Sequence, residues 1–212
     1  MSTVTENISA AQVKELREKT GAPMMDCRNA LQEAKGDLEQ AVVVLRKKGM
    51  ASAAKKASRS TSEGAVGTYI HAGGKIGVLI EINCESDFVA RSDDFQSLIK
   101  DLAMHIAATS PMFIRKEDVT PAAYAAEKEI CRAQAGASGK PEPVIEKIVE
   151  GKMAKFFQEV CLLEQPFVKE PSITLNQLIA KYIGTLGEDI SVRRFVRFKM
   201  GGTIVTRSPQ QK

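Results

Sequence analysis

The stretch KIGVLIEINCESDFVAR, residues 75–91, joins two different patterns of apolar residues. Apolar side chains occupy every second position from Ile76 to Ile82, which is the period of a half-buried strand. Soon after Phe88, residues 93–109 (DDFQSLIKDLAMHIAAT) carry apolar side chains at spacings of three and four, which predicts a helix. A strand that gives way to a helix within a few residues indicates a core containing both a sheet and helices.

The sequence on either side completes an α+β core. Residues 64–70 and the strand at 75–83 flank HAGG, whose two glycines suit a tight hairpin turn. Residues 189–200 (DISVRRFVRFKM) predict a third strand, with Val192, Val196, Phe198 and Met200 on its inner face and Phe195 pointing outward with the arginines. We therefore expect a three-stranded antiparallel sheet with helices on one side. Residues 120–164 predict an antiparallel helical hairpin, because a short polar connector joins two helical patterns.

Three short amphipathic segments precede this core, each followed by a glycine: Gly21, Gly36 and Gly49. Asp37 is the expected N-cap of the third segment. The predicted organisation is a three-helix domain (1–50), a basic linker that is partly helical at first (51–63), an α+β core (64–202) and a flexible tail (203–212).

The composition excludes several functional classes. The chain has 212 residues, of which 43% are hydrophobic, and no apolar run approaches the length needed to cross a bilayer. The N-terminus lacks the features of a secretory signal, so a cytoplasmic protein is expected. The four cysteines have neither zinc-site nor disulfide-framework spacing and are expected to be buried, reduced thiols. With only two histidines and no nucleophile motif, the residues indicate no enzyme, no cofactor and no metal site.

The positive charge of the chain leaves two interpretations open. Residues 1–60 carry 11 Lys and Arg against 7 Asp and Glu, and a basic run extends from Arg46 to Arg59 without an acidic residue. This run and the strand segment RRFVRF (193–198) are compatible with RNA binding through phosphate contacts and base stacking. The alternative is structural: a solvated helix and an ordinary strand of the sheet.

Phe88 also has two interpretations. It follows Asp87 at the end of a strand, where turn residues are more usual. It either closes the hydrophobic core at the edge of the sheet or enters a pocket of a partner protein, with Asp87 beside it as an anion. Aromatic residues of the second kind often dominate protein–protein affinity.

Two long motifs resemble a known family. TGAPMMDCRNALQEAKGDLEQAVVVLRKKG (20–49) and EINCESDFVAR (81–91) are similar to the two signatures of bacterial translation elongation factor Ts, and the resemblance extends over residues 8–202. Ser86 stands where the family usually has Thr, Pro23 replaces a usual Gly, and Arg28–Asn29 replaces a usual Lys pair. The chain has a single core unit and so resembles the short class of the family. This class is compatible with homodimerisation.

This resemblance implies a function. The family exchanges the guanine nucleotide of elongation factor Tu, and its N-terminal domain is a ubiquitin-associated-like three-helix bundle that docks on the GTPase. The resemblance implies that Ser86, Asp87, Phe88 and Val89 disturb the Mg²⁺ site of the partner, with His105, Met24 and Met25 as secondary contacts. It implies neither membrane association nor direct nucleic-acid binding. A ubiquitin-binding adaptor remains the alternative for the three-helix domain, although it leaves the core without a role.

Overall fold

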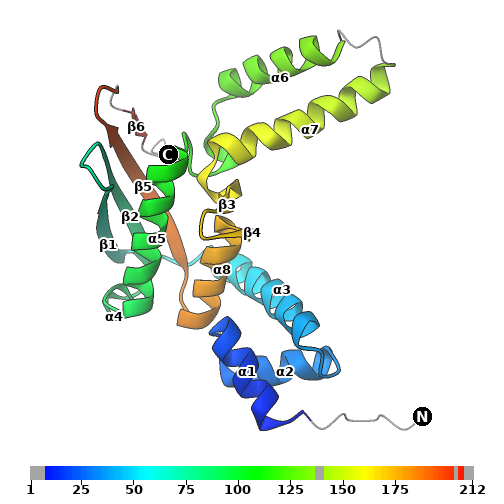
Figure 1. Cartoon of the computed structure of the whole chain (residues 1–212), viewed down its shortest axis with the longest axis vertical. Helices are drawn as coiled ribbons and strands as arrows, with labels where there is room; N and C mark the ends of the chain where they lie inside the picture. The colour runs from blue at the N-terminus through cyan, green and yellow to red at the C-terminus, as the bar shows by residue number, and fades with distance from the viewer. Residues whose placement is uncertain (1–7, 137–140, 203–204, 208–212) are drawn as a thin grey trace. The chain divides into compact units, whose positions relative to one another are not determined.

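The computed structural model describes residues 8–136, 141–202 and 205–207 (Figure 1). The described chain forms two compact units. Unit 1 contains the described residues of Met1–Ala65, Asn83–Leu98 and Gln177–Ser191. Unit 2 contains those of Val66–Ile82, Ile99–Asn176 and Val192–Lys212. Each unit therefore combines three separated segments, which is a different division from the sequential domains expected from the sequence. The connector at 137–140 and most of the expected tail lie outside the described residues.

After the first three helices, pairs of consecutive strands are separated by one or more helices. The helices are α1 (Ala10–Thr20), α2 (Met24–Glu33), α3 (Leu38–Lys56), α4 (Asp87–Ala90), α5 (Asp93–Thr109), η1 (Lys116–Asp118), α6 (Pro121–Gly136), α7 (Glu142–Val160), η2 (Leu162–Glu164) and α8 (Leu175–Leu186). The strands are β1 (Glu63–Ile70), β2 (Ile76–Cys84), β3 (Pro166–Phe167), β4 (Glu170–Thr174), β5 (Ile190–Lys199) and β6 (Val205–Arg207). None of the described helices is both long and apolar enough to cross a membrane.

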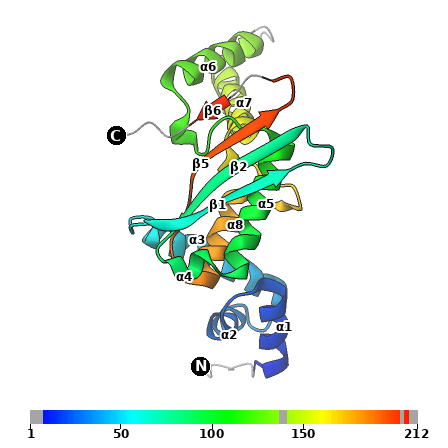
Figure 2. The same cartoon turned by 90° about the vertical axis from the view of Figure 1, so that its left-hand side faces the viewer.

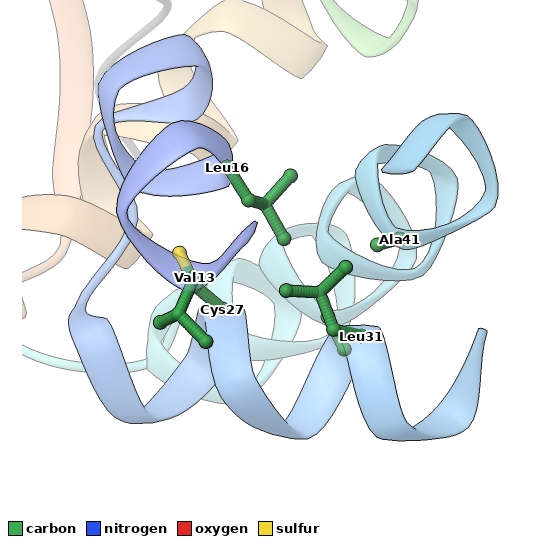
Figure 3. Close-up of a cluster of buried hydrophobic side chains, with 6 residues drawn as sticks. Val13, Leu16, Cys27, Leu31 and Ala41 are labelled. Carbon is green, nitrogen blue, oxygen red and sulfur yellow. The ribbon is translucent and has the colours of Figure 1, made fainter. Parts of the chain in front are cut away.

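The first three helices pack around a small apolar core. The buried side chains labelled in Figure 3 are Val13, Leu16, Cys27, Leu31 and Ala41. α3 begins as predicted, because the Asp37 carboxylate accepts hydrogen bonds from the backbone N–H groups of Glu39 and Gln40 at 2.8 and 3.0 Å. The predicted three-helix bundle is confirmed.

The third helix is longer than the sequence analysis expected. α3 continues through Gly49 to Lys56, so residues 51–56 of the predicted linker are helical, and its first part is helical as expected. The alanines at positions 51, 53 and 54 explain this extension, since alanine has the highest helix propensity. Gly49 brings α3 close to α8 within unit 1, where a β-carbon at that position would lie 3.5 Å from the Ala180 carbonyl oxygen.

The main sheet contains the three predicted strands and one addition. Its strand order is β1-β2-β5-β6, and Figure 2 shows the first three strands side by side. The turn between β1 and β2 uses Gly73 and Gly74 at φ 86° and 68°, as the sequence predicted. The short strand β6 pairs antiparallel with β5 and lies within the segment expected to be a flexible tail. β3 and β4 form a separate two-stranded ribbon.

The inner face of β2 packs as its alternation predicted, since Val78, Ile80 and Ile82 are all buried. The prediction for β5 was right for Val192, which is 5% exposed, and wrong for Phe195, Phe198 and Met200. Phe195 is buried at 7% exposure, whereas Phe198 and Met200 are 47% and 71% exposed. Two consecutive exposed residues, Arg193 and Arg194, shift the alternation by one position, and such a shift moves every following side chain to the other face.

Helix α5 lies against β1 at a glycine. A β-carbon on Gly67 would lie 1.9 Å from Cγ2 of Ile99, which is 2% exposed. We expect Gly67→Ala to lower the free energy of unfolding by about 1–3 kcal/mol, because the branched Ile99 side chain cannot easily turn away. Urea denaturation measures this change. The control is Gly151→Ala on α7, where a β-carbon meets no atom within 4 Å and a small stabilisation is expected. Equal stability of the two variants would contradict this packing.

Helices α6 and α7 form the predicted hairpin and lie side by side in Figure 1. Their shared core contains Cys131, Ala135, Ile145, Val149 and Met153. Thr120 caps α6, with its hydroxyl oxygen accepting from the Ala123 N–H at 3.3 Å. The four cysteines of the chain are free and buried, which confirms the prediction of reduced thiols. Burial raises the pKa of the Cys161 thiol to about 11.

Candidate partner-binding site

The candidate site begins where β2 ends and a single helical turn follows. Ser86 is the N-cap of α4, and its hydroxyl oxygen accepts a long hydrogen bond from the Val89 N–H at 3.4 Å. Ser92 then caps α5 by accepting from the Phe95 N–H at 3.3 Å. The chain therefore turns from strand to helix through a defined one-turn element.

Phe88 points into solvent. Its 82% exposure is the highest among the large apolar side chains of the described residues. Val89 and Ala90 are each 6% exposed, so the rest of the turn is attached to the core. The interpretation of Phe88 as a core residue at the sheet edge is therefore wrong. An exposed phenyl ring on a fixed turn is instead available to a partner.

The Asp87 carboxylate is also accessible. It accepts a hydrogen bond of 2.7 Å from the Arg91 guanidinium, which lies one turn later on the same surface. The two side chains are 60% and 80% exposed, and exposed pairs of this kind contribute little to stability. A partner could therefore replace Arg91 at small cost.

Behind this turn, the side chains of Glu188 and Glu85 each bind backbone N–H groups of the segment that carries the other. One oxygen of the Glu188 carboxylate accepts from the N–H groups of Glu85 and Ser86 at 3.1 and 3.0 Å, and the other accepts from the Ser86 hydroxyl at 2.6 Å. In the opposite direction, the Glu85 carboxylate accepts from the Asp189 N–H at 2.6 Å. We call these four residues the carboxylate brace: Glu85, Ser86, Glu188 and Asp189.

Sequence reasoning missed the brace, although Glu85 lay within the quoted motif. Its halves are more than 100 positions apart, and acidic residues at strand ends carry no distinctive spacing. The Asp189 N–H bond and the nearby Arg59 guanidinium lower the pKa of Glu85. Arg59 lies just after the end of α3 and contacts the Glu85 carboxylate at 3.2 Å.

Met24 and Met25, the predicted secondary contacts in the three-helix bundle, lie in the first turn of α2. They are 43% and 61% exposed. The helix begins after Pro23, whose φ of −55° suits a helix start. Both methionines are in unit 1 with Ser86, Asp87, Phe88 and Val89.

His105 lies in unit 2 and is fully buried. Its Nε2 atom lies 2.8 Å from Oε1 of Gln165, and its Nδ1 atom accepts from the Val168 N–H at 3.3 Å. These partners assign the neutral tautomer that carries its proton on Nε2. Burial lowers the pKa of His105, which keeps the ring neutral near pH 7.

Many cations proposed for RNA binding already have partners within the chain. Lys48 pairs with Glu33 at 2.8 Å, and Lys56 donates to the Ile183 carbonyl at 3.3 Å. On β5, Arg194 pairs with Glu81, and the Arg197 guanidinium donates to the Ala107 carbonyl near the end of α5. These contacts favour the structural interpretation of the basic segments.

Comparison with known proteins agrees with the two motifs. Residues 1–202 match the family model described as "Elongation factor TS". The chain is 72% identical over 195 residues to elongation factor Ts of Koribacter versatilis, an alignment that covers 92% of this chain and 89% of the relative. It is 63% identical to that of Solibacter usitatus, with 92% of both chains covered, and 60% identical to that of Geobacter sulfurreducens, with 92% and 90% covered. The chain therefore belongs to the elongation factor Ts family, the guanine-nucleotide exchange factors of translation elongation.

Proposed function

We propose that this protein accelerates GDP release from elongation factor Tu and that Asp87 and Phe88 disturb the Mg²⁺ site of that GTPase. The observation that carries the proposal is the placement of Phe88, whose ring is exposed while the adjoining Val89 and Ala90 are buried. Family membership supports the identity of the partner. The activity is expected in the cytoplasm, where elongation takes place, and it breaks no covalent bond.

The proposed mechanism acts through the Mg²⁺ ion of the GTPase. Mg²⁺ bridges protein ligands and nucleotide phosphates, so displacing its ligands weakens GDP binding. Phe88 would wedge between elements of the GTPase, and Asp87 would compete for polar groups nearby. The exchange factor succeeds only because it binds the nucleotide-free state more tightly than the GDP state.

The required energy exceeds what one ring supplies. A thousandfold acceleration needs about 4 kcal/mol of differential stabilisation, whereas burying one Phe contributes about 1.5–3 kcal/mol. Further contacts are therefore needed, and exposed Met24 and Met25 supply unbranched apolar side chains suited to a partner surface. Because His105 is fully buried, we propose that it contributes indirectly, by holding the backbone at the partly exposed Val168.

The test is stopped-flow release of a fluorescent GDP analogue from elongation factor Tu. Marked acceleration at substoichiometric amounts of this protein is the expected result. No acceleration with a cognate GTPase would overturn the proposed function. Salt-sensitive binding of RNA by the isolated chain would then favour the alternative raised by the basic segments.

A second copy of this chain is the proposed occupant of the outer sheet face. Large apolar side chains are exposed on this face and at the end of β5: Val66, Ile70, Leu79, Phe198 and Met200. The same face carries Glu81 and Arg194, but these two charges pair with each other, and an apolar face whose charges are paired suits a twofold contact with itself. This arrangement would give the homodimer compatible with the short class of the family.

The dimer makes a prediction about Leu79, which is 44% exposed. Leu79→Glu should raise the dimer dissociation constant at least about tenfold, because dimerisation would bury two unpaired charges. Sedimentation equilibrium measures the constant. Ile130→Glu, at a 50% exposed position on α6, is the matched control and should dimerise normally. A monomeric wild-type protein, or equal constants for both variants, would contradict the proposed face.

A further inference from the structure

The helical turn that carries Phe88 is too short to hold its own geometry. α4 has four residues, and an isolated turn of that length is unstable because the cost of nucleating a helix is not recovered. Its N-cap bond, from the Val89 N–H to the Ser86 hydroxyl, is long at 3.4 Å. The orientation of Phe88 must therefore depend on contacts outside the turn.

The carboxylate brace supplies such contacts. The Ser86 hydroxyl has one proton, and its short bond of 2.6 Å to Glu188 uses that proton. The lone pairs of the hydroxyl are then left to accept from the Val89 N–H, as an N-cap must. Glu188 therefore orients the capping group and fixes the backbone of residues 85 and 86 at the same time.

We propose that Glu188 is a positioning residue that holds the α4 turn so that Phe88 presents its ring to the partner. The inference rests on the proposed function and names a residue through which that function acts. Glu188 itself touches neither the GTPase nor its nucleotide in this proposal. It acts through Ser86, while Glu85 completes the brace by binding the Asp189 N–H and Arg59.

The charge of Glu188 is part of this role. Hydrogen bonds to an ionised acceptor are shorter and roughly twice as strong as neutral ones. One carboxylate accepting three of them can hold the turn rigidly, so that little ordering of the turn is needed when the partner binds. Replacing Glu188 by Gln retains the shape of the side chain but weakens the hydrogen bonds that it accepts. This substitution should therefore have a smaller effect than replacement by Ala.

The experiment compares Glu188→Ala and Glu188→Gln with the wild type. Glu150→Ala is the control, since Glu150 is an exposed carboxylate on α7 in unit 2. Backbone amide hydrogen exchange, followed by NMR, reports the order of Glu85, Ser86 and Val89. Stopped-flow GDP release, measured over a range of exchange-factor concentrations, separates the maximal rate from the half-saturating concentration.

Glu188→Ala should expose these amides to exchange and lower the maximal rate of GDP release about tenfold, which corresponds to about 1.4 kcal/mol. Glu188→Gln should give intermediate amide exchange and an intermediate maximal rate of GDP release. Glu150→Ala should match the wild type in both measurements. If Glu188→Ala fails to fold, the isosteric Gln variant decides the question. A wild-type maximal rate despite lost amide protection would mean that the brace only stabilises the fold, and it would overturn the proposal. If the wild-type protein itself releases no GDP, the proposed function fails, and amide exchange still decides whether Glu188 orders the turn.

Discussion

Replacing Phe88 by alanine is expected to slow GDP release from elongation factor Tu by roughly 10- to 150-fold. The estimate follows from the loss of about 1.5–3 kcal/mol when an apolar ring is no longer buried in the partner. The loss should appear mainly in the maximal rate if the ring is buried most deeply in the nucleotide-free complex. Stopped-flow kinetics with a fluorescent GDP analogue measure both the maximal rate and the half-saturating concentration.

The same variant should fold normally. Phe88 is 82% exposed, so its truncation removes almost no intramolecular contact, and such surface changes usually alter stability by less than about 0.5 kcal/mol. The matched control is Ile130→Ala, another exposed apolar side chain, which should exchange GDP at the wild-type rate. Normal exchange by Phe88→Ala would refute the wedge, and a large loss of stability would show that Phe88 has a structural role.

Local sequence patterns predicted the elements of this fold well because their causes are local. Asp37 caps the helix it was expected to cap, since a capping oxygen acts within three residues. The end of α3 was missed because glycine was taken as a stop signal, although the alanines after Gly49 favour continuation. The buried side chains of β5 after Arg194 were predicted wrongly, because strict alternation cannot anticipate a one-residue shift.

In the candidate site, too, features set by local sequence could be predicted and features set by tertiary contacts could not. The motif identified Asp87 and Phe88, but whether the ring was buried depended on tertiary structure and could not be decided from local spacing. The brace joins Ser86 to Glu188, and no local signal links residues so far apart. The burial of His105 was partly foreseeable, because it follows the buried Leu102 by three positions and Leu98 by seven, on the same face of α5.

That burial leads to the second large effect. We expect His105→Ala to lower the free energy of unfolding by about 2–4 kcal/mol, because the substitution leaves a cavity and removes a hydrogen-bond partner from both Gln165 and the Val168 N–H. Chemical denaturation at pH 7.5 measures the loss. A change below about 0.5 kcal/mol would show that the buried network contributes little.

The pH dependence separates this network from a simple packing defect. The folded-state pKa of His105 lies below its ordinary value of 6.5, so the unfolded chain binds a proton that the folded chain does not. Stability is therefore fully present above about pH 6.5 and falls as the pH is lowered, by at most about 1.4 kcal/mol per pH unit. Burial is the main reason that the folded state resists the charge, and protonating Nδ1 would in addition place its N–H against the Val168 N–H.

Between pH 7.5 and 5.5, wild-type stability should thus decrease more steeply than that of His105→Ala. His71→Ala is the control, because His71 is the other histidine of the chain and lies exposed at the hairpin turn between β1 and β2. This control should retain the wild-type slope. Parallel curves for the wild type and His105→Ala would mean that the ring accepts its proton without cost, which contradicts the hydrogen bond from Val168. A steeper wild-type curve would instead show that the folded state keeps the buried ring neutral.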